Sequence, residues 1–478
     1  MTMTTSVPRI ALATSTSGPD PSIAGLALIA GLTARGRRVQ YFRARSCPTP
    51  TETVAHATGM PGRHLDAWLM PPDVCLTLLA GGVRGADLGV VEGTVDEPAA
   101  ATAIDAPFLS SFMAPSEAVA GDLGPLADLL DLPVVSVAPI AGFRQGTFHL
   151  PRPPRGAAAV ILDGVESAED LERCRRLVRM TSGLPVVGAV DLLPAARAEI
   201  KSARPGTYPR EAVEALAASF LRHADLGAID DLAASRPYPD FIEQPVRRRA
   251  AGAAPFRVAF ARDEAFGCYF PDTFDALAAM GAKLVEFSPM NDGSLPDRID
   301  LVMLGCGLTN QYAARLASNL SMAAALRQHV CRGQRIYTEG GGSAYLGRSI
   351  VIDDERFAGA GIFPIDAEFV PNPQSPRRVA RRLSRDSWLG PRGTEVRGYR
   401  SGRWDLTFTP TTFECPSCSG PLSGDGDFYF RHHAVGSFVH LHLAALPDVV
   451  SAFAGPHHPS LVRPTPVRLP EEDQQGDA

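Results

Sequence analysis

The segment that most constrains the fold is Ile336–Gly347, in which an apolar strand runs into a glycine-rich turn. This pattern predicts a buried strand that turns sharply into the next element. In enzymes built this way the tight turn holds a nucleophile and exposes its side chain. The residue at that place is Gly340, which has no side chain. The segment therefore predicts the scaffold of a catalytic elbow without its reactive atom.

The loop after the first expected strand, Arg9–Ala13, is placed like a phosphate-binding loop. A working loop of this kind needs backbone N–H groups in a cradle, a lysine on the phosphates and a hydroxyl on magnesium. Ser17 and Gly18 match the start of such a loop, and Ser22 matches the hydroxyl position. These three residues are therefore the candidates for a nucleotide site.

The same loop lacks a lysine, because Pro21 occupies the lysine position and Asp20 replaces a glycine. Proline removes one backbone donor from the cradle. Two like unit charges about 4 Å apart repel by about 4 kcal/mol at an effective dielectric constant near 20. Lysine occurs only at Lys201 and Lys283, neither of which is near this loop in the sequence. We therefore expect that the loop does not bind ATP.

Composition excludes several other classes of protein. The chain has 478 residues, of which 45% are hydrophobic and 21% are charged, and its net charge is −6. These values are typical of a globular protein of two or three domains and give no support to nucleic-acid or membrane binding. No apolar run is long enough to span a bilayer, and no secretory signal is recognisable, so a cytoplasmic protein is expected.

The order of apolar and polar segments predicts two α/β domains. Residues 1–245 alternate short apolar strands with helical stretches, which indicates a doubly wound parallel sheet with both faces covered. A proline-containing linker is expected over 237–254, and a second α/β domain over 256–455. Within it, Trp404–Phe408, Phe428–Phe430 and Phe438–His442 alternate and are expected to be antiparallel strands. Residues 456–478 are expected to form a flexible tail.

Twelve short segments, in the same order along the chain, resemble the cobyrinate a,c-diamide synthases and related amidotransferases. They are Gly36–Phe42, Ala57–Pro61, Leu65–Met70, Val90–Gly93, Ala261–Phe266, Phe270–Pro271, Gly281–Ala282, Phe287–Pro289, Leu295–Pro296, Ser318–Met322, the elbow and Ser437–His442. The resemblance implies a nucleoside-triphosphatase-like first domain and a class I glutamine amidotransferase-like second domain. It also implies that ammonia from glutamine converts acyl phosphates, made with ATP and magnesium on a tetrapyrrole acid, into amides.

The resemblance assigns the glutamine-hydrolysing residues to the elbow. The family reads Glu-Cys-Gly-Gly where this chain reads Glu339-Gly340-Gly341-Gly342, so Gly340 occupies the nucleophile position. His440 aligns with the catalytic base, and His442 is the less favoured candidate; without a nucleophile both are expected to be vestigial. Cys306, after another strand, is an alternative nucleophile, because the family places its oxyanion hole in that loop.

The resemblance also assigns residues to the nucleotide and substrate sites. Glu92 is retained and could ligate a cation, although an acidic loop end without this role is an equal alternative. Asp66, Trp68 and Arg43 lie in segments that the family uses around its substrate; Trp68 is expected to pack in the core.

Two further patterns are less specific. Cys415 and Cys418, with His432 and His433 nearby, resemble half of a zinc site, although a reducible surface turn is the alternative. The arginines of 377–385 recur with a spacing of four, which predicts one face of a helix that could clamp carboxylates or be simply solvated.

Together these patterns favour a catalytically degenerate homologue that binds a tetrapyrrole acid or a protein partner and needs no cofactor. Such a partner could be an intact paralogue or a chelatase, and a homodimer is a further option. The alternative is an active amidotransferase that uses ATP and magnesium with free ammonia or a partner's glutaminase.

Overall fold

The computed structural model describes most of the chain, and the elements below belong to these parts of it. The described ranges are 7–14, 21–47, 52–95, 122–140, 153–203, 207–237, 256–371, 376–408, 423–424 and 427–454. The contacts divide the chain into two compact units. The first comprises 1–248 with 268–276 and 442–447, and the second comprises 249–267, 277–441 and 448–478. The expected linker, apart from Pro237, and the expected tail lie outside the described residues.

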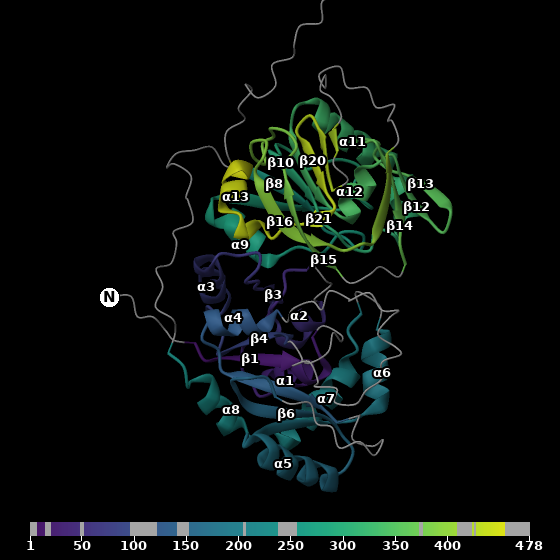
Figure 1. Ribbon diagram of the computed structural model, residues 1–478. Helices are drawn as coiled ribbons and strands as arrows, with labels where there is room; N and C mark the ends of the chain where they lie inside the picture. Colours follow the sequence, from purple (N-terminus) through teal and green to yellow (C-terminus); the bar gives the residue numbers. More distant parts are fainter. Residues whose placement is uncertain are drawn as a thin grey trace, which may run out of the picture. The chain divides into compact units, whose positions relative to one another are not determined.

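The first unit is built on a seven-stranded parallel sheet, shown in purple to teal in Figure 1. Its strands, in sheet order, are β3 (Arg63–His64), β2 (Val39–Arg43), β4 (Leu88–Thr94), β1 (Arg9–Thr14), β5 (Val134–Pro139), β6 (Ala157–Val165) and β7 (Val186–Asp191). Every residue of β1 is buried, as expected for a central strand covered on both faces. The predicted parallel α/β sheet is therefore confirmed.

Helices connect these strands. They are α1 (Ile23–Ala34), α2 (Glu52–Thr58), α3 (Pro72–Gly82), α4 (Leu123–Leu129), α5 (Ala168–Ser182), α6 (Pro194–Ser202), α7 (Arg210–His223) and α8 (Leu226–Ala233). Helix α1 is almost entirely apolar and buried, and it packs against α7. The contact of Ser22 with Glu92 of β4 places the start of α1 at the carboxyl end of β1 and its neighbour β4, which is the edge where α/β sheets bind ligands.

The second unit contains a second, mixed sheet. In sheet order it consists of β18 (Ser423–Gly424), β19 (Phe428–Arg431), β20 (Ala434–Ser437), β11 (Arg335–Glu339), β10 (Leu301–Leu304), β8 (Phe256–Ala261) and β9 (Ala282–Phe287). The strands from β20 to β9 are parallel, and β19 and β18 continue antiparallel. The helices associated with this half of the chain are α9 (Pro271–Ala279), α10 (Ala313–Ser318), α11 (Leu320–Cys331), α12 (Gly341–Leu346) and α13 (Pro447–Ala454), with a 3₁₀ turn, η2 (Leu443–Ala445).

Two smaller sheets complete the second unit. One contains β13 (Glu355–Ala358), β12 (Ser349–Ile352), β14 (Ile365–Phe369) and β17 (Trp404–Phe408). The other contains β15 (Arg377–Arg382), β16 (Glu395–Arg400) and β21 (Val439–His440). Strands β17, β19 and β21 each pair antiparallel with a neighbour, as expected from their alternation.

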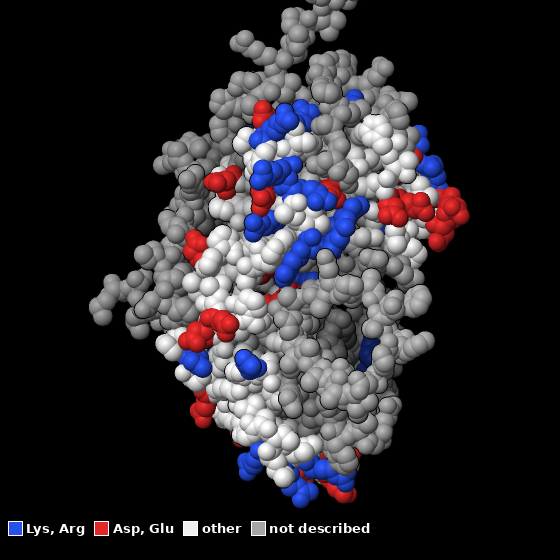
Figure 2. Space-filling model, in the orientation of Figure 1, with Lys and Arg blue, Asp and Glu red and all other residues white. Residues whose placement is uncertain are grey.

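The helix predicted for the arginine-rich run was wrong, because residues 377–382 form strand β15. This strand pairs antiparallel with β16, and Val379 is its buried member. Figure 2 shows basic side chains gathered over the region where Figure 1 labels β15 and β16. The exposed arginines of these two strands are Arg377, Arg378, Arg382 and Arg397.

No helix of the described residues is both long and apolar enough to cross a membrane.

Candidate functional site

The elbow lies between β11 and α12, in a fully buried stretch of the second unit. Gly340 has a φ of 49° and a ψ of −112°, a conformation that residues with a side chain adopt only under strain. Its N–H donates to the carbonyl of Ser437 at 2.8 Å, and its own carbonyl accepts from Ala344 N–H at 3.0 Å. The buried strand and the tight turn predicted from the sequence are therefore both present, and the turn leads into helix α12.

The glycines after the elbow are required by close packing. A Cβ atom on Gly341 would lie 2.1 Å from Thr309 Oγ1, and one on Gly342 would lie 2.4 Å from the carbonyl oxygen of Leu304. The N–H of Gly342 donates to the carbonyl of Gly305 at 3.1 Å. The start of α12 is thus pressed against the loop that follows β10.

The position of a side chain at residue 340 is defined by its neighbours. A Cβ atom on Gly340 would lie 2.8 Å from His440 Cε1 and 3.3 Å from His440 Nε2. The same point is 3.3 Å from Cys306 Cβ. His440 and Cys306 therefore both lie next to the place that a nucleophile at residue 340 would occupy.

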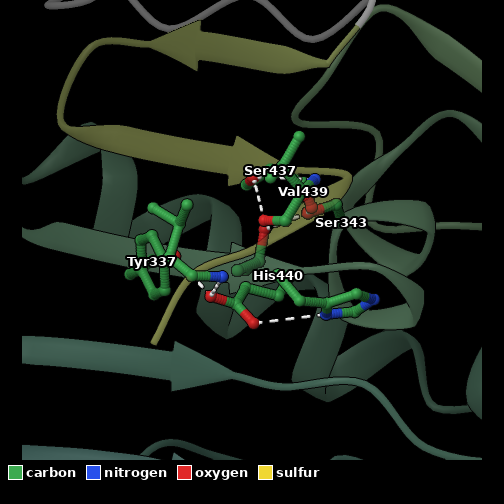
Figure 3. Close-up of polar contacts among 8 residues, drawn as sticks. Tyr337, Ser343, Ser437, Val439 and His440 are labelled. Carbon is green, nitrogen blue, oxygen red and sulfur yellow. Dashed lines mark hydrogen bonds and ion pairs between the residues drawn. The ribbon is translucent and has the colours of Figure 1, made fainter. Parts of the chain in front are cut away.

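A carboxylate orients the His440 ring from its other side. His440 Nδ1 lies 3.3 Å from Glu339 Oε2, and both residues are buried. Glu339 Oε1 accepts hydrogen bonds from Tyr337 Oη at 2.5 Å and from the N–H of Leu441 at 3.1 Å. Burial raises the pKa of Tyr337 well above its ordinary value, so the phenol keeps the proton that it donates. Figure 3 shows this chain of contacts.

Hydroxyl groups hold the backbone around this site. Ser343 Oγ donates to the carbonyl of Ser437 at 2.9 Å and lies 2.9 Å from Thr338 Oγ1. Ser437 Oγ donates to the carbonyl of Val439 at 2.5 Å, which fixes the chain just before His440 (Figure 3). Roles for Glu339, Tyr337 and these hydroxyls were not predicted from the sequence, although the position of Glu339 directly before the elbow could have indicated one.

His442, the second candidate base, has different neighbours. It is assigned to the first unit and is fully buried. Its ring centroid lies 4.5 Å from that of Phe270, and its Nε2 lies 3.6 Å from Asp272 Oδ2. The contacts at Glu339 and Gly340 involve His440 instead.

The candidate nucleotide site is described in part, because Ser17 and Gly18 lie outside the described residues. Ser22 is the N-cap of α1, and its Oγ accepts from the N–H of Gly25 at 3.0 Å. The backbone N–H of Ser22 donates to Glu92, at 3.3 Å and 3.4 Å from its two carboxylate oxygens. Tyr41 Oη also donates to Glu92, at 2.8 Å. A buried carboxylate therefore faces the first turn of this helix.

The three candidate substrate residues differ in their surroundings. Asp66 is buried, and its carboxylate accepts from the backbone N–H groups of Ser46, Trp68 and Leu69 at 3.0–3.1 Å. Trp68 is half-buried, so it is neither fully enclosed in the core nor exposed. Arg43 is half-buried at the carboxyl end of β2, where it is in register with Glu92 of β4.

The candidate zinc ligands Cys415 and Cys418 lie outside the described residues. Within the described ranges, no group of three or more His, Cys, Asp or Glu side chains could hold a metal ion. The rings of His432 and His433 contact each other, with centroids 4.3 Å apart.

Comparison with known proteins places these features in a family. Residues 257–446 match the CobB/CobQ-like glutamine amidotransferase domain family. The cobyrinate a,c-diamide synthase of Streptococcus sanguinis is 30% identical over 404 residues, which are 81% of this chain and 84% of that protein. The enzyme of the same name from Salmonella typhimurium is 29% identical over 92% of this chain and 96% of that protein.

Solved structures give weaker matches. A glutamine amidotransferase crystal structure covers 41% of this chain and 96% of its own, with a TM-score of 0.29 and 16% identity. The structure of PurLQS from Thermotoga maritima covers 42% of this chain and 98% of its own, with a TM-score of 0.29 and 13% identity. The sequence relatives carry the assignment, since the match to them extends over both units: the chain belongs to the cobyrinate a,c-diamide synthase family.

Proposed function

We propose that this chain is a catalytically degenerate member of the family, which binds a tetrapyrrole acid or a partner subunit without amidating it with ATP. Its relatives are named for an a,c-diamide of cobyrinate. In this proposal the chain still binds such a polycarboxylate but does not activate its carboxylates. The role is then one of binding or regulation in a cobalamin-type pathway.

The start of α1 carries this proposal, because it lacks the lysine of a phosphate-binding loop and already faces a carboxylate. The N-terminus of a helix attracts anions, because its first N–H groups lack partners in the helix and its dipole is positive there. In this chain the N–H of Ser22 already donates to the Glu92 carboxylate. A Cβ atom on Gly25 would lie 2.7 Å from both Glu92 oxygens, so the carboxylate lies directly against the first turn.

The proposal excludes ATP from this helix start. Magnesium held by Glu92 and the Ser22 hydroxyl would offset the repulsion between Glu92 and a phosphate, so the missing lysine is the stronger reason for this exclusion. Pro21, at the lysine position, supplies neither a positive charge nor an N–H donor. We therefore assign no step of the function to a nucleotide.

Arg43 supports the binding of a carboxylate at the same edge of the sheet. Arginine binds carboxylates through two parallel hydrogen bonds, and the carboxyl ends of parallel strands are the usual ligand edge of α/β sheets. Arg43 stands at this edge, on the strand next to Glu92. A tetrapyrrole acid offers several carboxylates that such a side chain can bind.

Two experiments test this proposal: one measures ligand binding, and the other looks for an amide product. Purified protein is titrated with cobyrinic acid while its absorbance is followed. We expect a saturable spectral change below high micromolar concentration. Arg43→Gln should weaken this binding about tenfold or more, in keeping with the loss of a charge-assisted hydrogen bond. Arg38→Gln is the matched control, because Arg38 is an exposed arginine that directly precedes the opposite end of β2 and pairs with Asp87.

A second reaction mixture contains the same acid with ATP, magnesium and either glutamine or ammonium. We expect no amide by mass spectrometry. An amide product would overturn the proposal in favour of an active amidotransferase that uses ammonia or a partner's glutaminase. The contact of Glu92 with Ser22 favours this second function, because a serine hydroxyl and a carboxylate at a helix start are typical magnesium ligands in nucleotide sites.

A further inference from the structure

We propose that Cys306 is a nucleophilic thiol, with His440 as its base, and that it accepts the acyl group of a primary carboxamide such as that of glutamine. This activity goes beyond the binding function proposed above, and it limits the degeneracy to the ATP-dependent step: the chain would release ammonia without amidating the tetrapyrrole acid. The proposal rests on the second unit alone.

The placement of Cys306 beside His440 is the first argument. The site of a Cβ atom on Gly340 lies 3.3 Å from Cys306 Cβ and 3.3 Å from His440 Nε2. A residue with a side chain at 340 would therefore compete with Cys306 for the space before the imidazole. Because residue 340 has no side chain, we infer that the thiol of Cys306 takes the place next to the imidazole.

The orientation of His440 is the second argument. Its Nδ1 faces the Glu339 carboxylate, so Nε2 is the nitrogen directed to the residue 340 position. A carboxylate on one nitrogen stabilises the imidazolium that forms when the other nitrogen takes a proton. This arrangement of nucleophile, base and carboxylate is the one that activates thiols and hydroxyls in acyl transfer.

The loop that carries Cys306 is held on both sides. The carbonyl of Cys306 accepts from the N–H of Gly267 at 3.2 Å, and the carbonyl of Gly305 accepts from Gly342. A Cβ atom on Gly307 would lie 2.4 Å from the carbonyl oxygen of Ala265, so the backbone passes close to its neighbour. Such contacts give the fixed placement that a nucleophile requires. Cys306 is half-buried, which leaves it accessible to a small reactant.

The chemical step balances without a cofactor. His440 takes the thiol proton, and the thiolate forms a bond to the carboxamide carbon. The C–N bond then breaks, and the leaving nitrogen takes the proton from His440 and departs as ammonia. Water hydrolyses the thioester, which gives the carboxylic acid and restores the thiol. Since the proposed function makes no acyl phosphate, an ATP-dependent carboxylate-activating partner would have to consume the ammonia.

The first experiment measures thiol reactivity in the full chain. The protein is treated with limiting iodoacetamide, and the rate at each cysteine is obtained by peptide mass spectrometry. We expect Cys306 to react at least about tenfold faster than Cys331, and His440→Gln to remove most of this difference. Cys331 is the matched control, since it is also half-buried and lies at the end of α11. Equal rates at both cysteines would overturn the activation of Cys306.

The second experiment measures ammonia release from L-glutamine. We expect release by the native chain and by Cys331→Ala, and a loss of about a hundredfold or more in Cys306→Ala and His440→Gln. Release that is the same in Cys306→Ala and in the native chain, or no release by the native chain, would overturn the acyl-transfer step. Neither result affects the cobyrinic acid titration, so failure of this inference is distinguishable from failure of the proposed function.

Discussion

At the scale of single residues, Gly340 combines a strained backbone with a crowded surrounding. Its φ of 49° favours glycine, and a Cβ atom there would lie 2.8 Å from His440 Cε1. The backbone of the elbow has therefore kept the geometry of a nucleophile's turn, while the space that the side chain would need is partly taken by the imidazole and by Cys306.

The first prediction concerns this residue. We expect Gly340→Ala to lower the free energy of unfolding by about 1–3 kcal/mol, because it adds both backbone strain and a contact that must relax. Urea unfolding of the full chain measures the change. Gly293→Ala is the control, since nothing lies within 4 Å of a Cβ atom at Gly293. An equal effect of both substitutions would show that residue 340 is not strained.

From the sequence alone, only those parts of the site that depend on neighbouring residues in the chain could be predicted. The turn at Gly340 follows from three consecutive glycines after an apolar strand. The distance between Cys306 and the elbow depends on how the loop after β10 packs against α12, and no local pattern encodes it. The contact of Glu92 with Ser22 is similar, because it needs β1 and β4 to be neighbours in the sheet.

At the scale of elements, the error at β15 has a simple cause. A spacing of four residues places side chains on one face of a helix and also on one face of a strand, because four is an even number. Arginine has no strong preference that separates the two, and Val379 is the one buried residue of the strand. The pairing with β16, which decides the outcome, joins residues that are thirteen or more positions apart in the sequence.

The second prediction concerns the side chain that ties β15 to β16. Asp427 is buried, and it pairs with Arg381 of β15 at 2.6 Å and with Arg400 of β16 at 3.2 Å. We expect Asp427→Asn to lower the free energy of unfolding by roughly 2–4 kcal/mol, because it removes the charge that both guanidinium groups face. Denaturant unfolding gives the value.

Glu395→Gln is the matched control for this prediction. Glu395 pairs with Arg397 at 2.9 Å, but both side chains are largely exposed, so its loss should cost less than about 1 kcal/mol. If the two substitutions had similar effects, Asp427 would have no special role in joining the strands.

The third prediction concerns His64, at the end of β3. Burial lowers the pKa of His64 to about 3, and the nearby Arg43 and His442 act in the same direction. The pKa is thus lower in the folded chain than the ordinary 6.5, so protonation favours the unfolded chain. The stability that neutral His64 contributes is complete above about pH 6.5 and declines as pH falls towards 3, by at most about 1.4 kcal/mol per unit.

His64→Phe removes this titration and preserves an aromatic ring against Phe270, whose centroid lies 5.1 Å from that of His64. We expect the variant to lose less stability than the native chain between about pH 6.5 and about pH 5. Urea midpoints at several pH values measure the loss. Parallel profiles for the two proteins would show that His64 is not the group responsible.

At the scale of the whole molecule, the two units differ in what they retain. The second unit keeps an oriented base and brings a thiol next to it. The first unit keeps the parallel sheet and the helix start of a nucleotide-binding domain, but it pairs that start with its own carboxylate. We therefore expect ligand binding at the first sheet edge to be independent of a nucleotide.

The last prediction tests this difference through ligand-linked stability. A ligand that binds only the folded chain raises the free energy of unfolding by about 2.7 kcal/mol at a hundred times its Kd. We expect cobyrinic acid to raise the unfolding temperature of the native chain and of Cys306→Ala equally, and to raise that of Arg43→Gln less. ATP with magnesium at about 1 mM should leave all three unchanged, because Pro21 supplies no positive charge at the helix start that a phosphate would need. Stabilisation of the native chain by ATP with magnesium, lost in Glu92→Gln, would show a magnesium-dependent nucleotide site and contradict the proposal.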